Sequence, residues 1–226
     1  MRPAPQLVLE KTATSWKQAN LQERGLHKRH GMQGPIDDAF LDPFLCVKPT
    51  GTPWNAGANA QALRELAHFD RVHSKYLRGH IRVKDDKDVT DADLKKYHVV
   101  LFGDPGSNRL IAKLAGRLPL RWTRQSFILG GKSFESDRYL PVLIYPNPLN
   151  AAKYVVLNSG LTVDDRDYPA SDYLTPRLGD FAVVKIQDVP GMPEPVVAGL
   201  FDENWKLPNE IPVVPPPPAI PARQGN

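Results

Sequence analysis

The loop Gly103–Asn108 carries two side chains that could do chemistry, the carboxylate of Asp104 and the hydroxyl of Ser107. A serine hydroxyl becomes a nucleophile when a neighbouring base removes its proton, and a carboxylate can orient the groups that do so. The loop comes after the apolar run His98–Phe102 and before the helical pattern Arg109–Arg117. Ser107 and Asp104 are therefore the candidate catalytic residues, with capping of the following helix as the alternative role.

The loop sequence G-D-P-G-S-N matches none of the familiar motifs for such sites. A hydrolase nucleophile loop is written G-x-S-x-G and a phosphate-binding loop ends in G-K-[ST], and neither pattern is present. The histidines that could act as general bases form no H-E-x-x-H or H-x-H pair, which argues against a zinc site of that kind. The sequence alone therefore does not pair Ser107 with a base.

Two further loops, Pro146–Asn150 and Asn158–Gly160, offer amides and a hydroxyl at the ends of apolar runs. In open α/β sheets, ligands bind beyond the carboxyl ends of the strands. We expect these two loops to join Gly103–Asn108 around one crevice. The candidate ligand-binding residues are the small, amide and hydroxyl residues of the three loops: Gly106, Asn108, Asn147, Asn150, Asn158 and Ser159.

Carboxylates gather in three places, and the pair Asp37 and Asp38 comes shortly before an expected buried strand. Calcium takes about six to eight oxygen ligands and suits acidic loops. A metal-assisted variant of the site therefore places Ca²⁺ on Asp37 and Asp38. No acidic cluster has the EF-hand spacing, and helix caps and solvated turns are the alternative roles. Cys46, the single cysteine, is interpreted as a small buried hydrophobic residue rather than a nucleophile.

The elements that position these loops alternate strands with helices in the first half of the chain. Phe44–Val47 is a short apolar run typical of a buried strand, and apolar spacings of three and four from Asn59 to Leu77 predict an amphipathic helix capped by Asn59. Thr90–Asp93 resembles a capping box. The second half is mostly strand-like, with a hairpin turn at Gly130-Gly131. The pattern predicts an α/β fold, a flavodoxin-like or Rossmann-like three-layer domain with a partly parallel sheet and an antiparallel extension.

The composition fits one globular domain with an excess of proline. The chain has 226 residues and 23 prolines, about twice the usual share of ~5%, which argues against a helix bundle. The net charge of +4 is scattered, so we expect no nucleic-acid partner. We expect no membrane span and no signal peptide, and a single cysteine suits the cytoplasm. The expected domains are an N-terminal extension (1–25), an α/β domain (26–206) and a Pro-rich extended tail (207–226).

Three stretches together resemble a known family: Lys28–Phe40 (KRHGMQGPIDDAF), His98–Asn108 (HVVLFGDPGSN) and Leu143–Gly160 (LIYPNPLNAAKYVVLNSG). They are similar to the C-terminal region of bacterial prolyl-oligopeptidase-like α/β-hydrolase and esterase proteins, over roughly residues 26–206. In that family the serine-hydrolase domain and its triad lie upstream of this region, so the resemblance transfers no catalytic residue. It implies association with a hydrolase domain.

Three hypotheses for the function follow. The first is a hydrolase acting on carboxylic esters or lactones of small molecules, with Ser107 as nucleophile or ligand contact, or with calcium-activated water as the nucleophile. The second is a non-catalytic accessory or carbohydrate-binding domain of a larger hydrolase. The third, a nucleotide- or flavin-binding protein, ranks last, because Pro105 lacks an amide donor and Asp104 is an anion.

Overall fold

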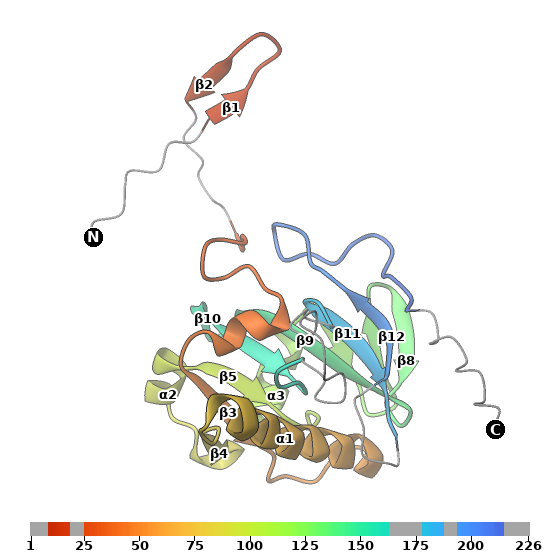
Figure 1. The fold of residues 1–226 in the computed structure, drawn as a ribbon. Helices are drawn as coiled ribbons and strands as arrows, with labels where there is room; N and C mark the ends of the chain where they lie inside the picture. Colours follow the sequence, from red (N-terminus) through yellow and green to blue (C-terminus); the bar gives the residue numbers. More distant parts are fainter. Residues whose placement is uncertain (1–8, 19–24, 163–177, 188–193, 215–226) are drawn as a thin grey trace, which may run out of the picture.

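The computed structural model describes residues 9–18, 25–162, 178–187 and 194–214 of the chain (Figure 1). Its largest element is a seven-stranded mixed sheet with the strand order β12-β11-β9-β10-β5-β3-β4. In that order, the strands are β12 (Glu194–Gly199), β11 (Phe181–Lys185), β9 (Tyr139–Asn147), β10 (Asn150–Leu157), β5 (His98–Leu101), β3 (Phe44–Lys48) and β4 (Val83–Asp85).

Four of these strands, β4, β3, β5 and β10, run parallel to one another. The chain goes from β3 outward to β4 and then back across β3 to β5, so the strand order reverses between β3 and β5. On the other side of β10, the strands β9, β11 and β12 are antiparallel to their neighbours. The sheet thus confirms the expected α/β class, with a partly parallel sheet and an antiparallel extension.

Helices are few and mostly short. The α-helices are α1 (Ala56–Leu77), α2 (Asp91–Lys96) and α3 (Arg109–Leu114), and the 3₁₀ helices are η1 (Ile36–Phe40), η2 (Asp86–Asp88) and η3 (Ala115–Arg117). The predicted capping box is confirmed, since Thr90 and Asp93 cap α2 reciprocally. The predicted cap of α1 is wrong. Asn55, not Asn59, accepts the Ala58 amide, so the helix begins about one turn earlier.

Two small sheets complete the structure. The first is three-stranded and follows η3, with β6 (Leu120–Trp122), β7 (Ser126–Leu129) and β8 (Lys132–Glu135) joined by antiparallel pairing. The second is the hairpin of β1 (Leu9–Lys11) and β2 (Trp16–Gln18), which Figure 1 shows standing away from the body. This hairpin lies within the expected N-terminal extension. Within the expected tail, Ile211 is buried, so that segment contacts the body before the proline run.

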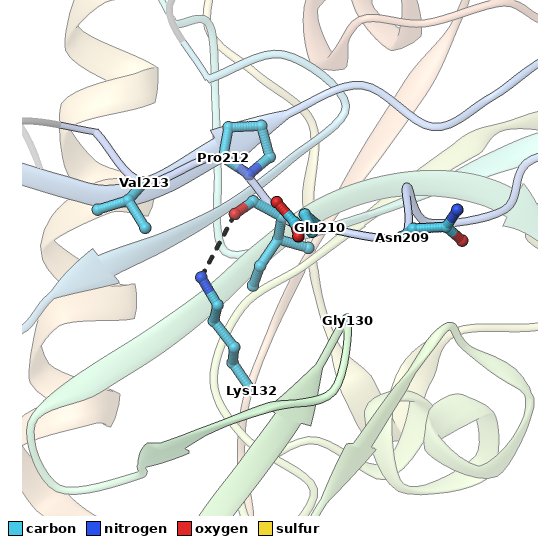
Figure 2. A pocket seen from close by; sticks show the side chains of 7 residues that line it. Gly130, Lys132, Asn209, Glu210, Pro212 and Val213 are labelled. Atoms are coloured by element: carbon cyan, nitrogen blue, oxygen red, sulfur yellow. Dashed lines mark hydrogen bonds between the residues drawn. The ribbon is translucent and has the colours of Figure 1, made fainter.

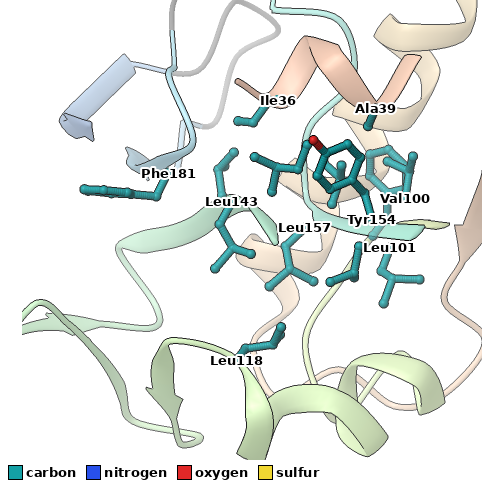
Figure 3. Close-up of a cluster of buried hydrophobic side chains, with 14 of the residues drawn as sticks. Ile36, Ala39, Val100, Leu101, Leu118, Leu143, Tyr154, Leu157 and Phe181 are labelled. Carbon is teal, nitrogen blue, oxygen red and sulfur yellow. The ribbon is translucent and has the colours of Figure 1, made fainter. Parts of the chain in front are cut away.

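The core is built from the strands of the large sheet and the segments that cover it. In Figure 3, Ile36 and Ala39 of η1 lie on one side of the strands, and Leu118, which follows η3, lies on the other. Phe40 of η1 contacts Phe69 of α1, so these two helices share a face. Segments on both faces therefore cover the strands, with η1 and α1 on the same face. The loops at the carboxyl ends of the parallel strands determine whether a crevice opens there.

Candidate functional site

Asp104 lies at the carboxyl end of β5, where the strand order reverses, and its carboxylate is fully occupied by backbone donors. One oxygen, Oδ2, accepts the amides of Trp54 and Asn55 at 2.8 and 3.2 Å. The other, Oδ1, accepts the amides of Gly106 and Ser107, both at 2.8 Å. The side chain is buried. Asp104 therefore ties the loop after β3 to the loop after β5.

Ser107 is also engaged within its own loop. Its hydroxyl accepts the Asp104 amide at 2.9 Å and donates to the Asp104 carbonyl at 3.2 Å. Its backbone carbonyl accepts the Gly51 amide at 2.8 Å. Ser107 is only 1% exposed, and the hydroxyl contacts are to main-chain atoms rather than to an imidazole or carboxylate. In this arrangement the hydroxyl closes a turn, and none of its partners among the described residues is a base that could activate it.

Asn108 begins α3 and holds together the two strands beside it. Its Oδ1 accepts the amides of Leu110 and Ile111, which caps the helix. Its Nδ2 donates to the carbonyls of Val47 and Phe102, at the ends of β3 and β5. The residue has no exposed surface. Capping of the helix, the alternative role for Ser107 and Asp104, is therefore performed by Asn108 and not by either of them.

The same kind of link continues to the outer parallel strands. Asp86, just after β4, accepts the Thr50 hydroxyl at 2.6 Å and the Arg109 amide at 2.8 Å. Asn158, just after β10, bonds the amide and the carbonyl of Gly103 and also donates to the Pro141 carbonyl. We call this set of hydrogen-bonded side chains the polar clasp: Thr50, Asp86, Asp104, Ser107, Asn108 and Asn158.

Close backbone packing leaves no room between the loops of the clasp. A Cβ on Gly51 would lie 2.6 Å from the Gly106 carbonyl oxygen, and a Cβ on Gly106 would collide with the Trp54 ring. Two loops that approach this closely require glycine at their contact. The reversal point between β3 and β5 is therefore filled by its own loops.

Replacing Gly51 by alanine should destabilise the protein by about 2 kcal/mol, because the added methyl group forces these loops apart. Gly116→Ala is the matched control. A Cβ at Gly116 meets nothing within 4 Å, so this change should alter the unfolding free energy by no more than about 0.5 kcal/mol. Urea unfolding of both variants measures the difference. Equal stabilities would contradict the tight contact between the loops.

The other amide candidates lie elsewhere. Asn147 and Asn150 flank the turn between β9 and β10, at the start of β10. Because β9 is antiparallel to β10, this turn lies at the opposite end of the sheet from Ser107, and the three loops do not share one crevice. There the Asn150 amide donates to the Leu94 carbonyl of α2. Ser159 does follow β10 at the clasp edge, and its hydroxyl donates to the Gly160 carbonyl.

Asp37 and Asp38 of η1 face two different partners. Asp37 accepts the amide and the hydroxyl of Thr162, just after β10, and burial raises the pKa of its carboxyl. Asp38 accepts the Tyr154 hydroxyl and the Gln33 amide. Among the described residues, no three histidine, cysteine or acidic side chains gather so that they could hold a metal ion. As arranged, the two aspartates do not fit a calcium site, because their carboxylates face different partners.

Glu65 is a buried acid that sequence reasoning missed. It lies on the buried face of α1, is 6% exposed, and accepts the Gly160 amide at the end of β10. Burial raises the pKa of its carboxyl from 4.5 to about 7. The sequence could have predicted that Glu65 is buried, because it falls four residues before Phe69 on the apolar face of the predicted helix. A carboxyl with this pKa can exchange a proton at neutral pH.

His98 is a second buried titratable group, at the start of β5. Its Nδ1 accepts the Tyr154 amide at 2.7 Å, so the neutral ring carries its proton on Nε2, which faces Asp42 at 3.6 Å. Burial lowers the pKa of the His98 imidazole, and nearby Lys153 adds to this effect. A second proton would have to sit on Nδ1, against the Tyr154 N–H. Protonation of His98 therefore breaks its hydrogen bond with the Tyr154 amide, which joins β5 to β10 in addition to their backbone pairing.

Acid should weaken the fold through His98. The pKa of His98 is lower in the folded chain than in the unfolded chain, where it is about 6.5. Its contribution to the free energy of unfolding is therefore fully present above about pH 6.5 and is lost as pH falls. We expect the stability difference between the wild type and His98→Gln to shrink between about pH 7.5 and about pH 5. Urea unfolding at several pH values tests this. A difference that is the same at every pH would show that His98 does not titrate on unfolding.

Surface grooves occur away from the clasp. One of them has a volume of about 560 Å³ and lies between the β7–β8 turn and residues 209–213 (Figure 2). There the Lys132 ammonium donates to the Ile211 carbonyl at 3.5 Å, and Gly130 packs against the Ile211 side chain. A groove of about 390 Å³ between α2 and α3 includes Asn150. The first groove is formed where residues 209–213 pack on the three-stranded sheet of β6, β7 and β8.

Comparison with known proteins finds no counterpart for this chain. No family model matches the sequence, and no curated protein and no solved structure matches it either. None of the helices in the described part of the chain is both long and apolar enough to cross a bilayer.

Proposed function

We propose that this chain is a non-catalytic accessory domain that works beside a hydrolase. The observation that carries the proposal is the polar clasp. Both oxygens of Asp104 accept two amides each, and the Ser107 hydroxyl is used between the Asp104 amide and carbonyl. Groups that hold four strand ends together in this way are suited to rigidity, because all of them are hydrogen-bonded and all except Thr50 are buried.

The proposed partner is a serine-hydrolase domain. The resemblance to the C-terminal region of prolyl-oligopeptidase-like hydrolases supports this choice, because in that family such a domain lies upstream of the region. The strand order β4-β3-β5-β10 supports a three-layer, doubly wound fold of the flavodoxin type. A fold of this type offers a rigid body with several faces for packing. The only cysteine, Cys46, is a buried free thiol, which suits a reducing compartment, so the proposed location is the cytoplasm.

One observation favours a second function, hydrolysis of small carboxylic esters or lactones by this chain itself. Glu65 of α1 accepts the Gly160 amide beyond the carboxyl end of β10, and burial raises its pKa to about 7. General acids and bases work best when their pKa is near the operating pH. In this candidate, Glu65 rather than Ser107 would transfer the proton, and water would be the nucleophile.

An activity assay separates the two functions. Short-chain esters and acyl-lactones are incubated with the wild type, Ser107→Ala and Glu65→Gln, with and without a chelator. The accessory function predicts no turnover above buffer, and equal background in all three proteins. Turnover that depends on Glu65 and rises across about pH 7 would establish the second function instead. Turnover lost only in Ser107→Ala would overturn the structural role given to Ser107.

The accessory function also makes a positive prediction. A purified serine-hydrolase domain of the resembled class should bind the chain, and isothermal calorimetry measures this directly. A typical domain interface buries enough surface for micromolar affinity or better, on the order of 1,200 Å² or more in total. The absence of binding heat at two temperatures would contradict the proposed partner.

A further inference from the structure

Lys28 inserts its ammonium group between an acidic and an aromatic side chain. Its Nζ lies 2.6 Å from Oδ2 of Asp180 and 5.1 Å from the centre of the Trp205 ring. The Trp205 ring in turn contacts Tyr145 and Tyr154 at centroid distances of 5.9 and 6.0 Å. We call these four side chains, Asp180, Trp205, Tyr145 and Tyr154, the amine cage. An anion plus an aromatic ring is the combination that recognises an ammonium ion.

The carboxylate of the cage has unused capacity. Asp180 has no exposed surface, and its Oδ2 accepts both the Lys28 ammonium and the Phe201 amide. Its Oδ1 has no hydrogen-bond partner among the described atoms. A buried carboxylate oxygen without a donor costs free energy, about 1–3 kcal/mol or more. The cage therefore holds more acceptor capacity than Lys28 fills.

The aromatic wall of the cage is held in a strained conformation. Trp205 has φ 58°, in the left-handed region that non-glycine residues rarely adopt, and is nevertheless 1% exposed. The turn that fixes it is closed by Asp202, whose carboxylate accepts the amides of Asn204 and Lys206. The Trp205 indole Nε1 also has no partner among the described atoms. Backbone strain that is retained around a buried ring is typical of ligand sites.

Lys28 is the partly exposed member of this arrangement. It is the one residue of 25–30 that is not exposed, and its side chain still keeps 18% exposure at the mouth of the cage. Its backbone is held separately, because the Lys28 amide donates to the Glu203 carbonyl at 2.6 Å. The side chain can therefore rotate into water while the main chain stays in place.

From these contacts we propose that the amine cage is a binding site for a primary alkylammonium ligand, and that Lys28 occupies it as an internal substitute. A primary amine is favoured over a quaternary one, because Asp180 bonds an N–H donor directly. When the ligand binds, its ammonium group takes the place of the Lys28 ammonium beside Asp180 and Trp205. The free ligand competes with a tethered lysine whose effective concentration is on the order of millimolar.

The test titrates the full-length chain with n-butylammonium chloride and follows the indole N–H signal of Trp205 by NMR, assigned with Trp205→Phe. The expected result is a saturable shift in the wild type at millimolar amine. In Lys28→Ala the shift should saturate at about tenfold lower concentration or less, since the internal competitor is gone. Lys206→Ala removes an equal charge from the same turn outside the cage, and should titrate like the wild type.

Two further arms establish what is recognised. n-Butanol has the same chain without the charge and should not shift the signal, whereas Asp180→Asn should abolish the response to the amine. If Asp180→Asn does not fold, the comparison of butanol with butylammonium still separates charge recognition from apolar filling. A wild-type signal that does not move with butylammonium overturns the proposal, even if Lys28→Ala binds, because Lys28 is then a fixed ion pair.

Discussion

Glu65→Gln should stabilise the protein at alkaline pH by roughly 3 kcal/mol and have little effect at acid pH. The carboxyl has a pKa of about 7 in the fold against 4.5 for a free side chain. The folded state therefore binds the extra proton between these values, and stability falls as pH rises through that window. A shift of this size corresponds to roughly 3 kcal/mol at about 1.4 kcal/mol per pH unit. Glutamine is uncharged, and its carbonyl can still accept the Gly160 amide.

Thermal or urea unfolding at about pH 5 and about pH 8 measures this effect. Glu203→Gln is the matched control, since it removes the same charge from an exposed position. It should leave the pH dependence of the wild type unchanged. If Glu65→Gln changed the stability equally at both pH values, the buried carboxyl would not be the group that titrates.

Asp104→Ala should cost about 4 kcal/mol of stability, the second large effect. The substitution leaves the amides of Trp54, Asn55, Gly106 and Ser107 without the carboxylate that now accepts all of them. An unsatisfied buried donor costs about 1–3 kcal/mol, and water entering the opened loop recovers part of the sum. A purely catalytic aspartate would behave differently, since its removal lowers activity and spares the fold.

The control for this prediction is Asp85→Ala. Asp85 is half-exposed, and its carboxylate forms only a 3.7 Å ion pair with Lys87 within the described part of the chain, so its removal should cost no more than about 0.5 kcal/mol. Chemical denaturation of both variants compares them directly. A stability of Asp104→Ala within about 1 kcal/mol of the wild type would contradict the structural role of the clasp.

Much of the fold was predictable because local patterns determine it. The strand at Phe44–Val47, the capping box at Thr90 and the unit of strand, turn and helix around Gly103 all depend on neighbours in sequence. The direction of β9 was not predictable, because antiparallel pairing with β10 is decided by long-range contacts. That one pairing places Asn147 and Asn150 at the opposite end of the sheet from Gly103–Asn108 and Asn158–Gly160, with which the sequence had predicted a shared crevice.

The chemistry of the site was harder to predict than its position. Sequence placed Ser107 and Asp104 after a strand, and the structure confirms that place. It could not show that Asp104 accepts the amides of Trp54 and Asn55, or that the Ser107 carbonyl accepts the Gly51 amide, because those bonds join loops about 50 residues apart. Asp180 and Trp205 were missed for the same reason, because their role depends on contacts with Lys28, which is distant from both in the sequence.

The most direct test of the closed clasp is native-state hydrogen exchange at the amides of Trp54, Asn55 and Ser107. All three donate to the buried carboxylate of Asp104, so each should exchange slowly, with protection on the order of a thousandfold or more over an open loop. In Asp104→Ala, which removes both acceptor oxygens, the protection of all three should fall together. Rapid exchange at these amides in the wild type would show an open crevice at the reversal point, and would contradict the structural role assigned to these residues.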